Sequence, residues 1–172
     1  MSLKLFGAIL ILAACSSFGF YLAAQHCKEV NCLRHFIGAL DYMGCELQYH
    51  MTPLPQLMHQ TAAQCYQQQL QNAFLKIAYE LEDKFHCNME QCVLNVLKTK
   101  DITLPSKTRA ALIDLGRSMG RFDIDGQLKG LENTRKQCSM ILEDLSKNQS
   151  ERLRSYRTLG ICAGAAMVIL FI

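Results

Sequence analysis

The sequence predicts an all-α protein: a six-helix bundle flanked by an N-terminal and a C-terminal membrane helix. Helix breakers are rare, because the 172 residues include only three prolines. Leucine, alanine, glutamine, lysine and glutamate, which all favour helices, are abundant. Apolar residues of the middle region recur at steps of three and four, the period of an amphipathic helix, and no stretch alternates for long enough to be a strand. Two uncharged apolar runs occupy the ends of the chain.

The apolar run at the start predicts a membrane anchor over residues 1–25. Residues 5–24 read LFGAILILAACSSFGFYLAA, and a helix of this length is about 30 Å long, the thickness of the hydrocarbon core of a bilayer. The same run contains LAAC, which resembles a lipoprotein signal that would be cleaved and lipidated at Cys15. Because the run stays apolar beyond the cysteine as far as Ala24, a retained anchor is the favoured interpretation.

The apolar run at the end predicts a second membrane segment over residues 158–172. Residues 159–172 read LGICAGAAMVILFI, and a helix of this length covers only about 21 Å, so spanning would need a locally thinned bilayer. Basic residues precede this run and none follows it, which places the intervening domain, residues 26–157, in the cytoplasm. These basic residues are Arg152, Arg154 and Arg157.

Apolar stripes and capping residues predict the helices of the bundle in order. The first helix continues out of the apolar run, and its stripe comprises Val30, Leu33, Ile37, Leu40, Gly44 and Leu47. The second begins within MTPLPQLM, with Thr52 as N-cap and Pro53 in the first helical position. Its predicted buried residues are Leu54, Leu57, Met58 and Cys65. The predicted stripe of the third helix comprises Leu70, Phe74, Ile77 and Leu81.

The second half of the bundle is predicted in the same way. Asn88 caps a short fourth helix, whose predicted buried residues are Val93, Leu94 and Leu97. Residues 98–106, KTKDITLPS, form a loop. A fifth helix follows over Lys107–Gly120, and a sixth, capped by Asp123, runs on into the second membrane segment and is expected to be the longest.

The stretch LGRSMGRFDIDGQ, residues 115–127, predicts a tight corner between the last two of these helices. Gly116 and Gly120 lie one turn apart on one helix face, where small residues allow a second backbone to come close. Gly120 is also expected to end the helix in a left-handed conformation. Asp123 and Asp125 could form a catalytic acid pair, but carboxylates at a helix start are favoured by the helix dipole, so capping is expected.

The corner stretch and ELQYHMTPLPQLM, residues 46–58, resemble the two signatures of the stage III sporulation protein AB family of endospore-forming bacteria. The opening MSLKLFGAILIL and the closing LGICAGAAMVILFI are also similar to the two ends of that family. The resemblance therefore covers essentially the whole chain, although this chain has more cysteines than the family pattern. The residues that carry the resemblance are Thr52, Pro53, Leu54, Gly116, Gly120, Asp123 and Gln127.

The resemblance implies a fold similar to the cytoplasmic domains of the inner-membrane platform proteins of type II secretion and type IV pili. It implies a non-enzymatic platform or scaffold subunit of the channel between mother cell and forespore, located in the mother-cell membrane around the forespore. The implied partners are the sporulation ATPase, stage III protein AA, and other proteins of the same complex. A homo-oligomer is also compatible with the resemblance.

No motif predicts catalysis, a cofactor or a metal. GRFDIDG lacks the lysine and the preceding strand of a phosphate-binding loop. Two groups of residues contain histidine and cysteine, but neither has the regular four-ligand spacing of a structural zinc site. The groups are His86, Cys87 and Cys92, and His26, Cys27, Cys32 and His35. A net charge of +3 is too small to indicate nucleic-acid binding.

Two further features leave alternatives open. The nine cysteines are expected to be buried free thiols in a reducing compartment; the alternative is a lipidated or thiol-active envelope protein built around Cys15. A basic run has only Asp101 and Asp114 as counter-charges, and could be a solvated face, a surface for an acidic partner, or a surface for anionic lipid headgroups. The run comprises Lys98, Lys100, Lys107, Arg109, Arg117 and Arg121.

Overall fold

The structure is a computed structural model that describes residues 2–83, 88–119, 123–147 and 158, with only Ser17 and Tyr21 described at side-chain level before residue 24. The described residues form six helices and no strand, which confirms the all-α prediction for this part of the chain. The helices are α1 (Ser2–His50), α2 (Leu54–Gln64), α3 (Gln68–Asp83), α4 (Met89–Lys98), α5 (Ser106–Ser118) and α6 (Ile124–Lys147).

The chain divides into two compact units, of which residues 29–143 form the larger and residues 1–28 with 144–172 the other. Among the described residues, no helix is both long enough and apolar enough to cross a bilayer. Most side chains of residues 5–24 lie outside the described residues, as do residues 159–172 and the flanking Arg152, Arg154 and Arg157. Both membrane segments and the domain bounds at 26–157 therefore stay predictions.

α1 is one uninterrupted helix of 49 residues. The first proline of the chain is Pro53, so nothing before it removes a backbone donor or forces a kink. The prediction that the first helix continues out of the apolar run is confirmed. The prediction that the last helix of the domain is the longest stays a prediction, because the described part of α6 has 24 residues and residues 148–157 lie outside the described residues.

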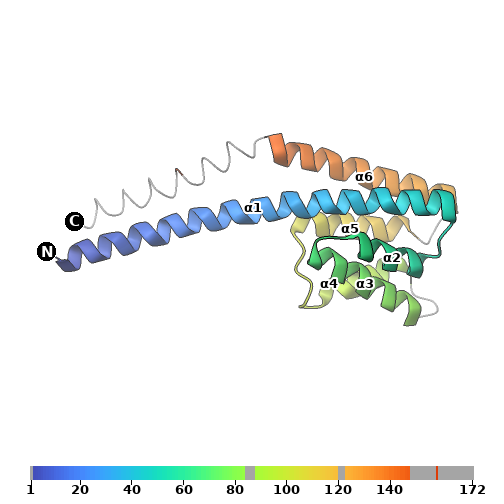
Figure 1. Cartoon of the computed structure of the whole chain (residues 1–172), viewed down its shortest axis with the longest axis horizontal. Coiled ribbons are helices and arrows are strands. Elements are labelled where there is room, and N and C mark those ends of the chain that lie inside the picture. The colour runs from blue at the N-terminus through green and yellow to red at the C-terminus, as the bar shows by residue number, and fades with distance from the viewer. Residues whose placement is uncertain (1, 84–87, 120–122, 148–157, 159–172) are drawn as a thin grey trace. The chain divides into compact units, whose positions relative to one another are not determined.

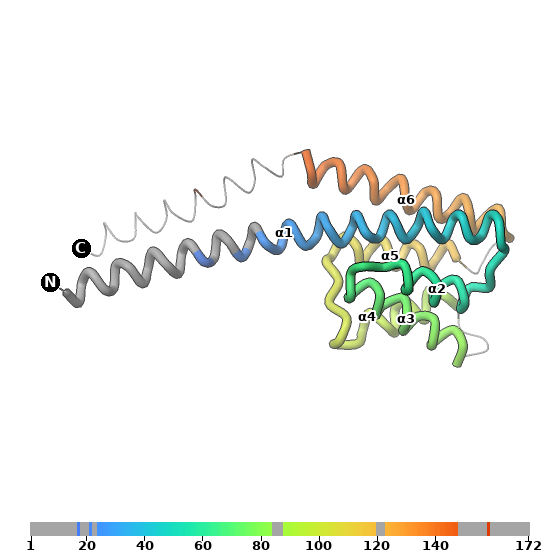
Figure 2. The backbone as a smooth tube through the Cα atoms, viewed as in Figure 1, coloured from blue at the N-terminus to red at the C-terminus, as the bar shows by residue number. Residues whose placement is uncertain are grey.

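The core of the 29–143 unit forms between α1 and the short helices α2 to α5. Each short helix packs against the next one along the chain, and together they lie along one side of the carboxyl-terminal half of α1 (Figures 1 and 2). The Phe36 ring of α1 is parallel to the Phe74 ring of α3, with centroids 6.3 Å apart. Other fully buried side chains are Leu33, Leu40, Met43, Leu57, Met58, Leu70, Ile77, Met89, Leu112 and Leu115.

Four large apolar residues predicted to be buried are not. Ile37, Leu54 and Leu81 are only partly buried, and Leu94 is exposed. The buried face of α4 follows Met89, Val93 and Val96 at steps of four and three, and also includes Cys92 and Leu97. Leu94 follows Val93 by one residue, which turns it about 100° away from this face.

α6 runs antiparallel to α1 within the 29–143 unit. A Cβ added to Gly44 of α1 would lie 3.6 Å from Leu131 of α6. The Asp41 carboxylate, earlier in α1, pairs with Arg135, which lies later in α6. The α1–α2 corner and the α5–α6 corner therefore lie at the same end of the unit, which we call the corner end (Figure 1). The opposite end, where Glu29 meets the connection between α4 and α5, is the loop end.

Candidate interaction site at the corner end

α5 crosses α4 closely at Gly116. Gly116 is buried, and a Cβ added there would lie 3.1 Å from Val93 Cγ2 and 3.3 Å from the backbone Cα of Glu90. A backbone atom at this distance leaves almost no room for a side chain. The small residue that the sequence analysis placed at a helix contact is therefore at the point where the backbones of α4 and α5 approach each other.

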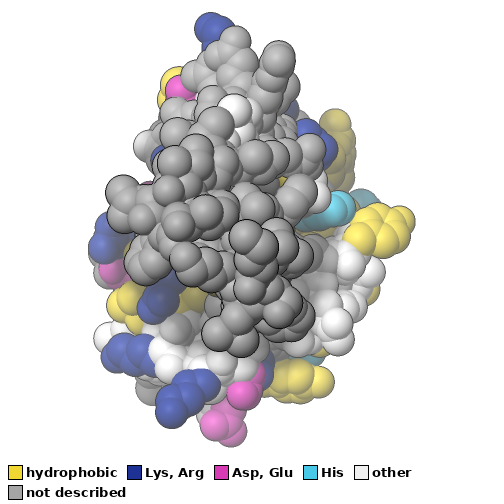
Figure 3. All heavy atoms as spheres, turned by 90° about the vertical axis from the view of Figure 1, so that its left-hand side faces the viewer, with side chains coloured by type: hydrophobic (Ala, Val, Ile, Leu, Met, Phe, Trp, Pro, Cys, Tyr) yellow, Lys and Arg dark blue, Asp and Glu magenta, His cyan; other side chains and the backbone are white. Residues whose placement is uncertain are grey.

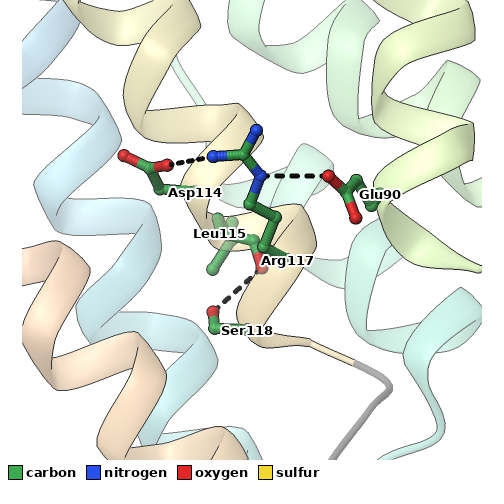
Figure 4. Close-up of polar contacts among 5 residues, drawn as sticks. All are labelled: Glu90, Asp114, Leu115, Arg117 and Ser118. Carbon is green, nitrogen blue, oxygen red and sulfur yellow. Dashed lines mark hydrogen bonds and ion pairs between the residues drawn. The ribbon is translucent and has the colours of Figure 1, made fainter.

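Arg117, the next residue, joins the same two helices on the exposed side. Its Nε donates to Glu90 Oε1 at 3.0 Å, and its Nη1 donates to Asp114 Oδ1 at 3.4 Å (Figure 4). Glu90 raises the pKa of Arg117, so this side chain stays cationic. Sequence reasoning named Asp114 as a counter-charge but missed Glu90, which lies on another helix.

α5 ends earlier than predicted. Its last residue is Ser118, whose hydroxyl donates to the Leu115 carbonyl at 3.0 Å, and Met119 is already extended, with φ −89° and ψ 139°. The helix therefore ends before Gly120, which was predicted to terminate it. Gly120 itself lies outside the described residues, together with Arg121.

Asp123 begins α6. Its Oδ1 accepts the backbone N–H of Gly126 at 3.1 Å, and its carbonyl accepts the N–H of Gln127 at 2.9 Å. The first contact satisfies a donor that has no partner inside the helix, as an N-cap does. The carboxylate of Asp123 thus has a structural use. A role of Asp123 or Gln127 in meeting a partner stays a prediction.

Sequence reasoning missed a second glycine contact at this corner. A Cβ added to Gly130 of α6 would lie 2.5 Å from the Ser118 Cβ of α5, closer than real Cβ contacts. Gly126 and Gly130 are spaced four apart, like Gly116 and Gly120, so the same pattern could have found this contact. We call the set Gly116, Arg117, Ser118, Asp123 and Gly130 the glycine corner.

At the α1–α2 corner, α2 begins one residue later than predicted. Thr52 does not cap α2, because its hydroxyl donates to Glu46 Oε2 of α1 at 3.1 Å. Pro53 takes the N-cap position, with ψ 144°, and its carbonyl accepts the N–H of Leu57 at 2.8 Å, so Leu54 is the first helical residue. Just before it, Met51 has φ 50°, which is uncommon for a residue other than glycine.

The predicted basic residues do not form one face. Arg117 lies at the corner end, whereas Lys107 and Arg109 begin α5 about 15 Å away along the helix. The guanidinium of Arg109 donates to the Leu97 carbonyl at 3.3 Å and so satisfies the carboxyl end of α4. Lys98 and Lys100 are exposed at the same loop end.

The cysteines that the structure describes are free thiols: Cys27, Cys32, Cys45, Cys65, Cys92 and Cys138. Within the described residues, no group of three histidine, cysteine or acidic side chains could hold a metal ion. His86, Cys87 and Cys162 lie outside the described residues, and the side chain of Cys15 is not among those that the structure describes. Burial raises the pKa of Cys65 to about 11 and the pKa of Cys138 to about 11, so both stay protonated at neutral pH.

These two thiols give a pH prediction. The unfolded chain releases the two protons near the ordinary thiol pKa of 9.0, whereas the folded chain keeps them up to about pH 11. The stability that they contribute is therefore complete below pH 9 and is lost as the pH rises to about 11. Thermal unfolding at pH 8 to 11 should show this loss, and a Cys65→Ala/Cys138→Ala variant should show a shallower one. Equal slopes for the two chains would contradict the assignment.

Together, the fold and the site define a small all-helical bundle in which close glycine contacts and an arginine–glutamate pair join helices at the corner end. The sequence pattern of the family described as stage III sporulation protein AB matches residues 4–172, and the chain belongs to this family. The resemblance noted in the sequence is thereby confirmed, and it assigns the chain to sporulation.

Two relatives agree with this assignment. The chain is 26% identical over 170 residues to stage III sporulation protein AB of Bacillus subtilis (strain 168), covering 98% of each chain. A solved structure of stage III sporulation protein AB, 22% identical, matches the fold with a TM-score of 0.60. That match covers 72% of this chain and 98% of the other.

Proposed function

We propose that the chain is a membrane-anchored, non-enzymatic scaffold subunit of the channel complex between mother cell and forespore, and that it docks the ATPase of that complex. The observation that carries this proposal is the family match over residues 4–172, which includes both uncharged end runs as well as the bundle. The proposed partners are stage III protein AA and other proteins of the complex, and the proposed location is the mother-cell membrane around the forespore.

The corner end supports docking there. Tyr49 is 74% exposed and Met51 67% exposed, and α6 adds Ile124 at 38%. Tyrosine and methionine are enriched at protein interfaces. The positive φ of Met51 is a local strain of the kind that clusters at functional positions. Figure 3 shows the side of the molecule that is at the left of Figure 1, where hydrophobic side chains appear at several separate places.

Co-purification from sporulating cells tests the docking. The tagged full chain, extracted from membranes, should recover the ATPase. A Tyr49→Ala/Met51→Ala variant should reduce recovery roughly tenfold, since truncating two anchors of an interface removes 1.4 kcal/mol or more of binding energy. Tyr66→Ala is the matched control, because Tyr66 is 92% exposed but lies at the far end of α2. No recovery with the unmodified chain, or equal recovery with all three chains, would refute the docking.

The mass of the mature chain separates the anchor from the lipoprotein alternative. An intact N-terminus supports the retained anchor. A chain that begins at Cys15 and carries acyl groups would instead establish the lipidated envelope protein and overturn the two-anchor arrangement.

A further inference from the structure

α3 and α4 lie side by side (Figure 1) and leave an open groove between them, with a volume of about 760 Å³. The wall that α3 supplies includes Tyr79 and Glu80, and the wall that α4 supplies includes Asn95 and Val96. All of these residues belong to the 29–143 unit. We call this feature the α3–α4 groove.

Tyr79 gives the groove an aromatic side chain that the fold does not bury. It is 60% exposed, and the His59 ring of α2 meets its ring edge to face, with centroids 5.2 Å apart. His59 is itself held by Glu82, since its Nε2 lies 3.1 Å from Glu82 Oε1. Val96, only 3% exposed, adds an apolar contact on the α4 side. An exposed aromatic ring fixed by its neighbours beside an apolar side chain is typical of protein interfaces.

The wall formed by the end of α3 is negative. Glu80, Glu82 and Asp83 line it, and the last turn of α3 contains no basic residue. The next residue, Lys84, lies outside the described residues. The last carbonyls of a helix have no partner inside the helix and make its end negative, so carboxylates are disfavoured there. A cation that enters the groove at this end would relieve that repulsion.

The described basic residues around the groove lie away from this end of α3. Among the described lining residues, Lys76 is the only lysine or arginine, and it pairs with Asp101 at 3.0 Å. Thr99 follows the last residue of α4, and the exposed Lys98 and Lys100 flank it there. The groove is therefore negative where α3 ends and has lysines only toward the end of α4.

We propose that the α3–α4 groove binds a basic segment of a partner protein, in which lysines or arginines flank an apolar side chain. The apolar side chain packs on Tyr79 and Val96, and the basic side chains meet Glu80 and Asp83. A cation over the exposed face of the tyrosine ring gains a cation–π contact as well. Opposite charges orient the segment in the groove, while the aromatic contact contributes more of the affinity. The negative wall repels anionic partners such as lipid headgroups.

Binding of the purified ATPase to the detergent-solubilised full chain tests the groove. This inference rests on the proposed function, because it makes the ATPase the protein that supplies the basic segment. Bio-layer interferometry gives the Kd at about 0.05 M and about 0.5 M salt, which differ strongly in screening.

Two groove variants change the charge by different routes. Glu80→Gln/Asp83→Asn removes two carboxylates at nearly unchanged volume, and should weaken binding roughly tenfold at the lower salt and less at the higher. Asn95→Lys adds a cation at an exposed position of the α4 wall and should weaken binding by a similar factor. The matched control, Glu132→Gln/Asp144→Asn, removes two exposed carboxylates from α6 and should change the Kd less than about twofold.

An unchanged Kd in both groove variants would overturn the proposal, and so would an equal loss in the control or a loss that is the same at both salt concentrations. Heating followed by circular dichroism identifies a variant that fails to fold, in which case the other variant decides. Reduced self-association with unchanged ATPase binding would assign the groove to a second copy instead. Binding that only Tyr49→Ala/Met51→Ala abolishes would keep the docking and refute the groove. No binding by the unmodified chain would refute both.

Discussion

Replacing Gly116 by leucine should lower the melting temperature of the purified chain by about 3–10 °C. Any side chain there meets Val93 at 3.1 Å and the backbone of Glu90 at 3.3 Å, so α4 and α5 must move apart. Overpacking of this kind costs about 1–3 kcal/mol, and each kcal/mol shifts the midpoint by roughly 2–4 °C in a chain of this size. Circular dichroism during heating measures the change.

Gly38 provides the matched control. It also lies inside a helix, but an added Cβ would have no atom within 4 Å. Gly38→Ala should therefore raise stability by up to about 1 kcal/mol, because alanine loses less backbone entropy in a helix. Gly116→Ala has the same intrinsic gain but must displace its neighbours. Equal stabilities for these two alanine variants would mean that Gly116 does not set the α4–α5 distance.

Gly130→Ala is expected to destabilise the junction of α5 and α6 by about 1–3 kcal/mol. Its Cβ would lie 2.5 Å from the Ser118 Cβ, and both atoms are attached directly to helix backbones, so no rotamer change relieves the overlap. Gly44→Ala should be much milder, because its new Cβ would be 3.6 Å from a flexible leucine carbon.

A double-mutant cycle isolates this contact. Adding Ser118→Gly to Gly130→Ala removes the opposing Cβ, and should recover most of the lost stability, with a coupling energy of about 0.5–3 kcal/mol. Thermal unfolding of the four chains gives the coupling directly. Additive effects would show that Ser118 and Gly130 do not constrain each other.

The helical elements could be derived from local pattern because burial here follows the helix period. Val30, Leu33, Leu40 and Leu47 of the predicted stripe are buried, whereas Ile37 and Gly44 are partly buried. Asp123 caps α6 as predicted, and α4 begins after Asn88, although the Asn88 side chain makes no capping hydrogen bond. Local chemistry misled the prediction at Thr52. A threonine hydroxyl is generally a favourable N-cap, but in the folded chain the Thr52 hydroxyl donates a hydrogen bond to Glu46, near the end of α1.

The sequence by itself determined the class of fold, the helix order and the family, since periodicity, capping residues and signature spacing are all short-range properties of the chain. Only the tertiary structure decided which residues meet. It paired Arg117 with Glu90, set Gly130 against Ser118, and divided the basic run between the two ends of the bundle. These contacts depend on the angles at which the helices cross and on where each helix begins along the length of the bundle. That geometry is set only when the apolar faces of the separate helices pack together in one core.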